Sequence, residues 1–378
     1  MQAVTMSKEI RYPIIRPTLP DFSEVEGDLR AIWESGMLTT SRMVRALEAQ
    51  TAEICGVEHC VAMANCTSGL VLAVKALGLT GEVILPAFTF AATGHALIWN
   101  DIEPVFVDCD PGTYTIDPES VRAAITERTS AIIAVHLFGL PPDIDALQAI
   151  ADEHGVTLMF DAAQGLGATY KGQPVGGFGA VEVFSMSPTK VITACEGGLV
   201  TTNDGELAQV MRQMRDYGKG LDGYDMAFIG LNARQSEFHA AVGLAGLRHL
   251  GDYMGHRLEM IALYRELLAG LDGVTFQEFP EERTTSGNYM VMRIDGEAAK
   301  MSRDALYDAL MERGIQTKKY FYPALHRHSA YAEWGARYEG RVPESERLSH
   351  EGLAVPLYGH IAPEECEEIA ATVRELLG

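Results

Sequence analysis

Short apolar runs recur along the first two-thirds of the chain, separated by segments with apolar residues at every third or fourth position. Segments such as 70–79 and 144–153 have the spacing of helices that bury one face. The apolar runs have the length of strands and are hydrophobic on both faces, which is typical of a parallel sheet covered by helices. We expect seven strands, at 60–64, 82–85, 104–107, 131–135, 156–160, 181–184 and 198–202.

The pattern changes in the last third of the chain. Apolar positions over 234–271 follow a helical period, with a break expected near Gly251. Residues 289–294 alternate like a strand, and 302–313 opens with serine and an acidic residue, as helices do. The segment 363–377 begins with proline and predicts a closing helix.

Length and pattern together predict two domains. A chain of 378 residues accommodates a large core and a smaller one. We expect a large α/β domain over 1–245, with an N-terminal arm and a mostly parallel sheet flanked by helices. A smaller C-terminal α+β domain is expected over 246–378.

Composition argues against several classes of protein. The formal net charge of −22 disfavours binding to nucleic acid or to an anionic membrane, and no basic run offsets it. No segment is apolar for long enough to span a bilayer. Six scattered cysteines without a CxxC pair indicate free thiols in a reducing cytoplasm. We therefore expect a cytoplasmic protein with small-molecule partners.

Ligands of an open parallel sheet bind beyond the carboxyl ends of the strands, so the residues there are candidates for chemistry. Small polar residues at 65–69 follow the first strand and open a helix, which favours an anion site suited to phosphate. An ordinary helix cap by Thr67 or Ser68 is the alternative. Phe90, after the second strand, could stack on a planar cofactor or belong to the core.

Asp161 and Lys190 follow two later strands. A carboxylate behind a buried strand is costly without a cationic partner, and the protonated pyridine nitrogen of a pyridoxal cofactor would be one. Helix capping by Asp161 is the alternative. Lysine forms Schiff bases with carbonyl groups, and Lys190 lies among hydroxyls before Gly197 and Gly198. The combination predicts a pyridoxal 5'-phosphate site with Lys190 as the Schiff-base residue.

Other motifs are weak. Gly165 and Gly167 lack the third glycine of a dinucleotide fingerprint. His326 and His328 could share a metal, but two histidines in a polar loop are more often surface or substrate-facing residues. We expect no metal site.

Several motifs carry a resemblance to a known family. They lie at 35–40, 82–93, 104–108, 136–139, 161–204, 230–234 and 322–326. Over nearly its whole length the sequence resembles the DegT/DnrJ/EryC1/StrS family, which are sugar aminotransferases of fold type I. The resemblance implies that Lys190 carries the cofactor and moves protons. Asp161 would pair with the pyridine nitrogen, Gln164 would hydrogen-bond near the phenolic oxygen, and Phe90 would stack on the ring.

The resemblance also assigns the cofactor's phosphate. Thr67, Ser68 and Ser185 would hold it, and Asn232 would reach it from the neighbouring subunit, so a homodimer is part of the expected mechanism. Cys66 stands where the family usually has glycine.

The implied reaction is a two-step transamination. L-glutamate or L-glutamine gives its nitrogen to the cofactor, and the pyridoxamine 5'-phosphate intermediate aminates a keto group of a sugar in amino-sugar biosynthesis. A nucleotide-activated ketosugar is the preferred acceptor, and a free ketocyclitol is the alternative. Relatives that dehydrate carry histidine in place of Lys190, so a PLP-dependent elimination ranks lower, and a non-catalytic PLP-binding regulator ranks last.

Substrate contacts are the least specific part of the prediction. The sequence offers cations for a diphosphate at Arg234, Lys318, Lys319 and Arg327. Tyr320 and His326 are candidates for contact with the sugar.

Overall fold

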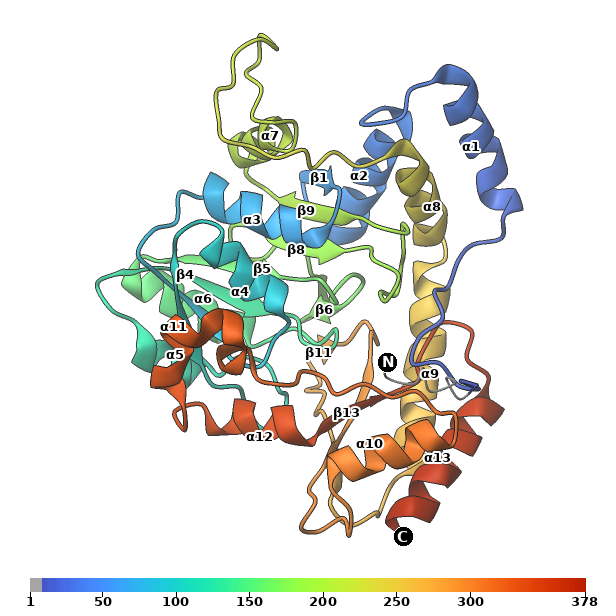
Figure 1. The fold of residues 1–378 in the computed structure, drawn as a ribbon. Helices are drawn as coiled ribbons and strands as arrows, with labels where there is room; N and C mark the ends of the chain where they lie inside the picture. The colour runs from blue at the N-terminus through green and yellow to red at the C-terminus, as the bar shows by residue number, and fades with distance from the viewer. Residues whose placement is uncertain (1–8) are drawn as a thin grey trace, which may run out of the picture.

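A seven-stranded sheet forms the centre of the larger part of the molecule (Figure 1). The structure is a computed structural model that describes residues 9–378. The strand order is β1-β9-β8-β5-β4-β2-β3, and β9 runs antiparallel to its neighbours β1 and β8 in an otherwise parallel sheet. The strands are β1 His59–Met63, β2 Glu82–Pro86, β3 Glu103–Val107, β4 Thr129–Val135, β5 Thr157–Asp161, β8 Glu182–Ser185 and β9 Gly198–Thr202. All seven predicted strands are present, each within two residues of its predicted bounds.

Helices cover both faces of this sheet. Alternate side chains of one strand point to opposite faces, so Val61 and Met63 pack with α3, α4 and α7, whereas Cys60 and Ala62 pack with α2 and α8. Helices α5 and α6 cover the far end of the second face. The helices are α1 Ser23–Ser35, α2 Arg42–Cys55, α3 Cys66–Ala76, α4 Ala91–Ile98, α5 Pro118–Ala124, α6 Ile144–His154, α7 Gly205–Met214 and α8 Glu237–Leu247.

A second core lies around a three-stranded antiparallel sheet, in the order β10-β12-β13. The break expected near Gly251 is present and falls at residues 248–249, between α8 and α9. This part contains α9 Leu250–Leu267, β10 Val274–Phe276, β12 Met290–Ile294, α10 Arg303–Glu312, β13 Gly352–Val355 and α13 Pro363–Leu377. A small third sheet joins β6 Thr169–Tyr170, β7 Gln173–Pro174 and β11 Arg283–Thr284.

The chain returns from the small sheet to the large one before it ends. Leu325, Tyr331 and Val342 of this returning segment pack in the core of the large sheet. The segment contains the short helices η1 Leu325–Arg327, η2 Ser329–Tyr331, α11 Ala332–Gly335 and η3 Ala336–Tyr338. Helix α12, Pro343–Glu351, then begins against the end of β3.

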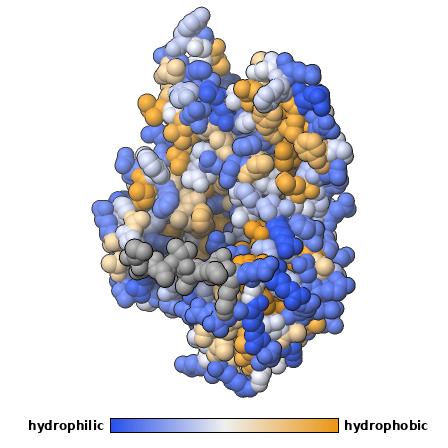
Figure 2. Space-filling view, turned by 45° about the vertical axis from the view of Figure 1, so that its right-hand side comes forward, coloured by the Kyte–Doolittle hydropathy of each residue, from blue (hydrophilic) through white to orange (hydrophobic). Residues whose placement is uncertain are grey.

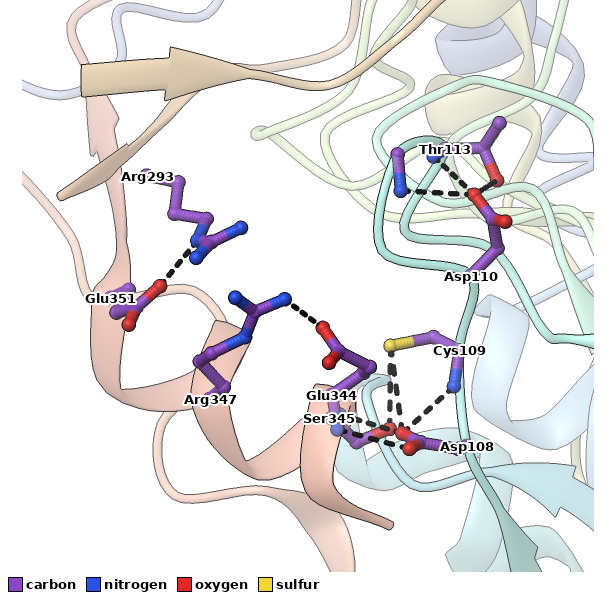
Figure 3. Close-up of polar contacts among 10 residues, drawn as sticks. Asp108, Cys109, Asp110, Thr113, Arg293, Glu344, Ser345, Arg347 and Glu351 are labelled. Carbon is purple, nitrogen blue, oxygen red and sulfur yellow. Dashed lines mark hydrogen bonds and ion pairs between the residues drawn. The ribbon is translucent and has the colours of Figure 1, made fainter. Parts of the chain in front are cut away.

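Asp108 fastens α12 to the large sheet (Figure 3). Its carboxylate accepts hydrogen bonds from the backbone N–H groups of Glu344, at 2.9 Å, and Ser345, at 2.7 Å. The Ser345 hydroxyl lies 3.4 Å from the Cys109 thiol in the same contact. The start of α12 is therefore bound to the large sheet through Asp108, which follows β3, and its end continues directly into β13 of the small sheet. No helix within residues 9–378 is long and apolar enough to cross a membrane.

Candidate active site

A cavity of about 280 Å³ opens at the carboxyl ends of the parallel strands. Its walls come from the segments that follow β1, β2, β5 and β8, and from the crossing between the two cores. It is lined by Asn65, Cys66, Thr67, Thr89, Phe90, Ala92, Val135, Asp161, Ala163, Gln164, Ser185, Ser187, Thr189, Lys190, Glu196, Tyr289, Lys318, Tyr320 and Phe321. Eight of the candidate residues named from the sequence meet here: Thr67, Phe90, Asp161, Gln164, Ser185, Lys190, Lys318 and Tyr320.

The start of α3 forms one wall. Asn65 caps the helix, because its side-chain oxygen accepts from Ser68 N at 2.8 Å, and the Ser68 hydroxyl donates to Asn65 O at 2.9 Å. Neither Thr67 nor Ser68 is the cap, so the Thr67 hydroxyl remains at the cavity. The first N–H groups of a helix have no acceptor within it and attract anions. This end of α3 therefore suits a phosphate group.

Gly198 allows this approach of β9 to α3. A Cβ atom at Gly198 would lie 2.5–2.6 Å from backbone atoms of Asn65 and Cys66. Backbone atoms cannot move aside as a flexible side chain can, so only glycine fits here.

Asp161 ends β5 and is 3% exposed. Its carboxylate accepts from the Thr93 hydroxyl at 2.7 Å and from Ala163 N at 3.1 Å. Burial raises the pKa of Asp161, although these hydrogen bonds and the positive charge of Lys190 act in the opposite direction. A protonated pyridine nitrogen would supply the close cation that a buried carboxylate requires.

Gln164 and Phe90 present complementary groups to the same space. The Gln164 Oε1 accepts from Phe138 N at 2.6 Å, so its Nε2 is the group left to donate. The Phe90 ring is 58% exposed and lies 6.2 Å from the ring of Phe321. The Phe90 ring can therefore stack on a pyridine ring, and the Gln164 Nε2 can donate a hydrogen bond to a phenolic oxygen on that ring.

Lys190 lies beside a cluster that the sequence did not predict. Its Nζ is 5.9 Å from the centre of the Tyr289 ring, and Tyr289 packs against Tyr320 with ring centres 4.8 Å apart. Burial alone would raise the pKa of Tyr289, but the charge of Lys190 and hydrogen bonds from neighbouring groups outweigh it, so this pKa is lowered. Tyr289 and Phe321 are about 100 residues or more from Lys190 along the chain, and no local motif marks them.

Six of the candidate residues lie outside the cavity lining: Ser68, Asn232, Arg234, Lys319, His326 and Arg327. Asn232 is exposed, at the end of a hairpin that spans 217–231. Arg234 forms an ion pair with Asp216 and lies over the Tyr217 ring. His326 is 2% exposed and its Nε2 is 3.0 Å from Glu346.

Comparison with known proteins assigns the chain to a family. Residues 22–374 match the DegT/DnrJ/EryC1/StrS aminotransferase family, and the chain belongs to this family of PLP-dependent enzymes. The protein is an aminotransferase. A dTDP-4-amino-4,6-dideoxy-D-glucose transaminase from Escherichia coli is 33% identical over 97% of each chain. A UDP-N-acetyl-3-dehydro-alpha-D-glucosamine 3-aminotransferase from Acidithiobacillus ferrooxidans is 36% identical over 88% of each chain.

A solved structure supports the same assignment. The crystal structure of DesI, determined in the presence of its TDP-sugar product, matches with a TM-score of 0.91 at 37% identity. The match covers 98% of this chain and 94% of that chain. The predicted fold class, a mostly parallel sheet flanked by helices with a smaller C-terminal α+β part, is confirmed, and the smaller sheets are antiparallel.

Proposed function

We propose that this aminotransferase moves the amino group of L-glutamate or L-glutamine to a keto group of a nucleotide-activated sugar. Pyridoxal 5'-phosphate would be held at Lys190, and the reaction would take place in the cytoplasm. The observation that carries the proposal is the meeting of Lys190 and the buried carboxylate of Asp161 at one cavity. The relatives named for dTDP- and UDP-linked sugars support the acceptor class.

The proposal gives a role to four residues of the cavity: Thr67, Asp161, Gln164 and Lys190. Pyridoxal phosphate, when bound, supplies a carbonyl and an electron-withdrawing ring. Asp161 would hold the proton on the ring nitrogen, Gln164 Nε2 would donate toward the phenolic oxygen, and Thr67 with the N–H groups of α3 would hold the phosphate. The Nζ of Lys190 would take a proton from the substrate carbon that bears the transferred nitrogen and would return it to the carbon on the other side of that nitrogen.

The exposed surface supports a homodimer. Large apolar side chains are exposed on and after α1, at Phe22, Trp33, Met37 and Leu38. Others lie on the hairpin that precedes Asn232, at Leu221, Tyr224, Met226, Ile229 and Leu231. Figure 2 shows apolar atoms gathered on the upper half of the molecule, where Figure 1 places α1. Clustered exposed apolar surface marks protein interfaces, so we propose that a second copy covers it and that Asn232 reaches the partner's phosphate site.

A product assay tests the proposal. The purified protein with pyridoxal phosphate is incubated with L-glutamate or L-glutamine and a nucleotide-linked 3- or 4-ketosugar. The expected products are a 2-oxo acid and an aminosugar nucleotide, identified by mass spectrometry in equal amounts. Loss of water from the sugar without uptake of nitrogen would indicate an elimination instead. Turnover of a free ketocyclitol, but not of any nucleotide sugar, would contradict the proposed acceptor class.

A further inference from the structure

The four cations that the sequence offers for substrate binding have different surroundings. Lys319 forms an ion pair with Asp304 at 2.7 Å, and Arg327 forms one with Glu339 at 3.0 Å. Arg234 pairs with Asp216. Lys318, in contrast, has no ion pair with any acidic group in residues 9–378, and it lines the cavity.

The backbone explains why neighbouring lysines differ. Lys318 pairs with Ala354 in an extended segment, where successive side chains point to opposite sides. Lys318 and Tyr320 therefore share the side that faces the cavity, and Lys318 Nζ lies 4.7 Å from the centre of the Tyr320 ring. Lys319 points the other way, toward α10, which carries Asp304.

Lys318 is connected to Lys190 by two aromatic rings. The Lys190 Nζ lies over Tyr289, Tyr289 packs against Tyr320, and the Lys318 Nζ lies over Tyr320. The two ammonium groups thus occupy one wall of the cavity with two phenol rings between them. A ligand that reacts at Lys190 would have Lys318 within reach of its other substituents.

The proposed function gives no role to Lys318, although it is one of the charged residues of the cavity. The charged residues in its lining are Asp161, Lys190, Glu196 and Lys318. The proposed function engages Lys190 with the cofactor carbonyl and Asp161 with the ring nitrogen, and the N–H groups of α3 take the phosphate. An amino-acid donor brings a further negative charge, its α-carboxylate, one bond from the reacting carbon. In a nucleotide sugar the diphosphate is separated from the keto carbon by atoms of the sugar ring.

We propose, on the basis of the proposed function, that Lys318 binds the α-carboxylate of the amino donor and so determines that the donor is an α-amino acid. The carboxylate would lie between the Lys318 ammonium group and the cavity wall that carries the rings of Tyr289 and Tyr320. Lys318 is a substrate-binding residue in this account, and it takes no part in proton transfer.

The test uses Lys318→Met, with Lys319→Met as the matched control. Loss of the cofactor's visible absorbance is followed against L-glutamate concentration in the absence of any sugar. The Lys318→Met protein should need at least tenfold more L-glutamate for half-maximal rate, whereas the Lys319→Met protein should resemble the unaltered protein. Binding of 2-oxoglutarate to the pyridoxal form, measured by calorimetry without turnover, should weaken by a similar factor only in Lys318→Met.

A neutral donor gives an independent readout. L-glutamic acid α-amide lacks the α-carboxylate charge, so the unaltered protein should discriminate against it at least tenfold more strongly than the Lys318→Met protein does. Equal behaviour of both lysine variants with L-glutamate and 2-oxoglutarate would overturn the inference. An effect confined to the amination of the ketosugar would overturn it too, and would place Lys318 at the diphosphate.

The two proposals fail in distinguishable ways. If neither L-glutamate nor L-glutamine discharges the cofactor of the unaltered protein, the proposed donor is wrong. In that case the lysine variants are compared with the α-amino acid that does discharge the cofactor and with its 2-oxo acid, and the absence of any such α-amino acid would overturn the inference.

Discussion

The hydroxyl of Thr93 donates a 2.7 Å hydrogen bond to Oδ2 of Asp161. The two residues come from α4 and β5, and the same hydroxyl lies 2.9 Å from that of Thr89. Together with the N–H of Ala163, this bond fixes the plane of the carboxylate. Asp161 is therefore oriented before any cofactor arrives.

The stability of the cofactor-free protein should reflect the burial of Asp161. An acid whose folded-state pKa is raised favours the protein at low pH, and this contribution is lost as the pH rises through the folded-state value. Asp161→Asn should therefore stabilise the cofactor-free protein near pH 7 by about 1–3 kcal/mol. The gain should disappear below the ordinary aspartate pKa of 3.8. Urea unfolding at several pH values measures the difference, and a less stable Asn variant at pH 7 would contradict this reasoning.

Asp161→Asn should lower turnover, although it should raise the stability of the cofactor-free protein. Asparagine can still accept from Ala163 and donate to Thr93, so the geometry is retained. It cannot hold a proton on the pyridine nitrogen by charge, and we expect turnover to fall about 100-fold or more, in the range typical of a lost electrostatic stabiliser. Steady-state kinetics of the cofactor-saturated protein measures this, and unchanged turnover would argue against a pyridinium partner.

Gly198→Ala should weaken cofactor binding. The added methyl group would collide with the backbone at Asn65 and Cys66 and would displace the start of α3. We expect pyridoxal phosphate affinity to fall at least tenfold and the protein to lose about 1–3 kcal/mol of stability. Gly251→Ala is the control, because Gly251 lies inside α9 with no atom within 4 Å of the added carbon. That change should stabilise the protein by about 0.5–1 kcal/mol.

Asp108→Ala should loosen the attachment of α12. The change removes an acceptor for two N–H groups at the start of the helix, and loss of such a cap costs about 1–2 kcal/mol. Asp108→Asn retains one acceptor oxygen and should cost less. Chemical denaturation of the three proteins tests the order, and an Ala variant as stable as the unaltered protein would show that α12 is held by other contacts.

Mixed dimers test the proposed role of Asn232. Lys190→Ala and Asn232→Ala should each lower activity at least tenfold. When the two variants are mixed and allowed to exchange subunits, one site of each mixed dimer combines an intact Lys190 with an intact Asn232 from the partner. Activity should then rise well above the sum of the separate variants. No rise, with exchange verified by mass spectrometry, would mean that Asn232 acts within its own subunit or not at all.

Sequence pattern was sufficient for the elements that bury apolar residues at a regular period. The seven strands of the large sheet, and the helices α10 and α13, lie where the pattern predicted them. The same regularity brought Asp161, Ser185 and Lys190 to one edge of the sheet, because the carboxyl ends of parallel strands meet there.

The residues that the sequence missed belong to contacts between distant segments. Thr93 lies on a helix and reads as an ordinary helical residue until α4 packs beside β5. Tyr289 directly precedes β12, and Phe321 lies on the segment that returns from the small sheet to the large one, so both reach the cavity only through tertiary packing. The sequence pattern also could not predict that β9 runs antiparallel, since an apolar run looks the same in either direction.

The most direct test of the central claim is the absorbance of the purified protein with pyridoxal phosphate, compared with that of Lys190→Ala. The account predicts a yellow protein that borohydride reduction fixes as a pyridoxyl group on Lys190, as located by peptide mass spectrometry. It also predicts that L-glutamate or L-glutamine bleaches the colour and releases a 2-oxo acid. A pyridoxyl group on another lysine, or no colour in the unaltered protein, would contradict the assignment of Lys190.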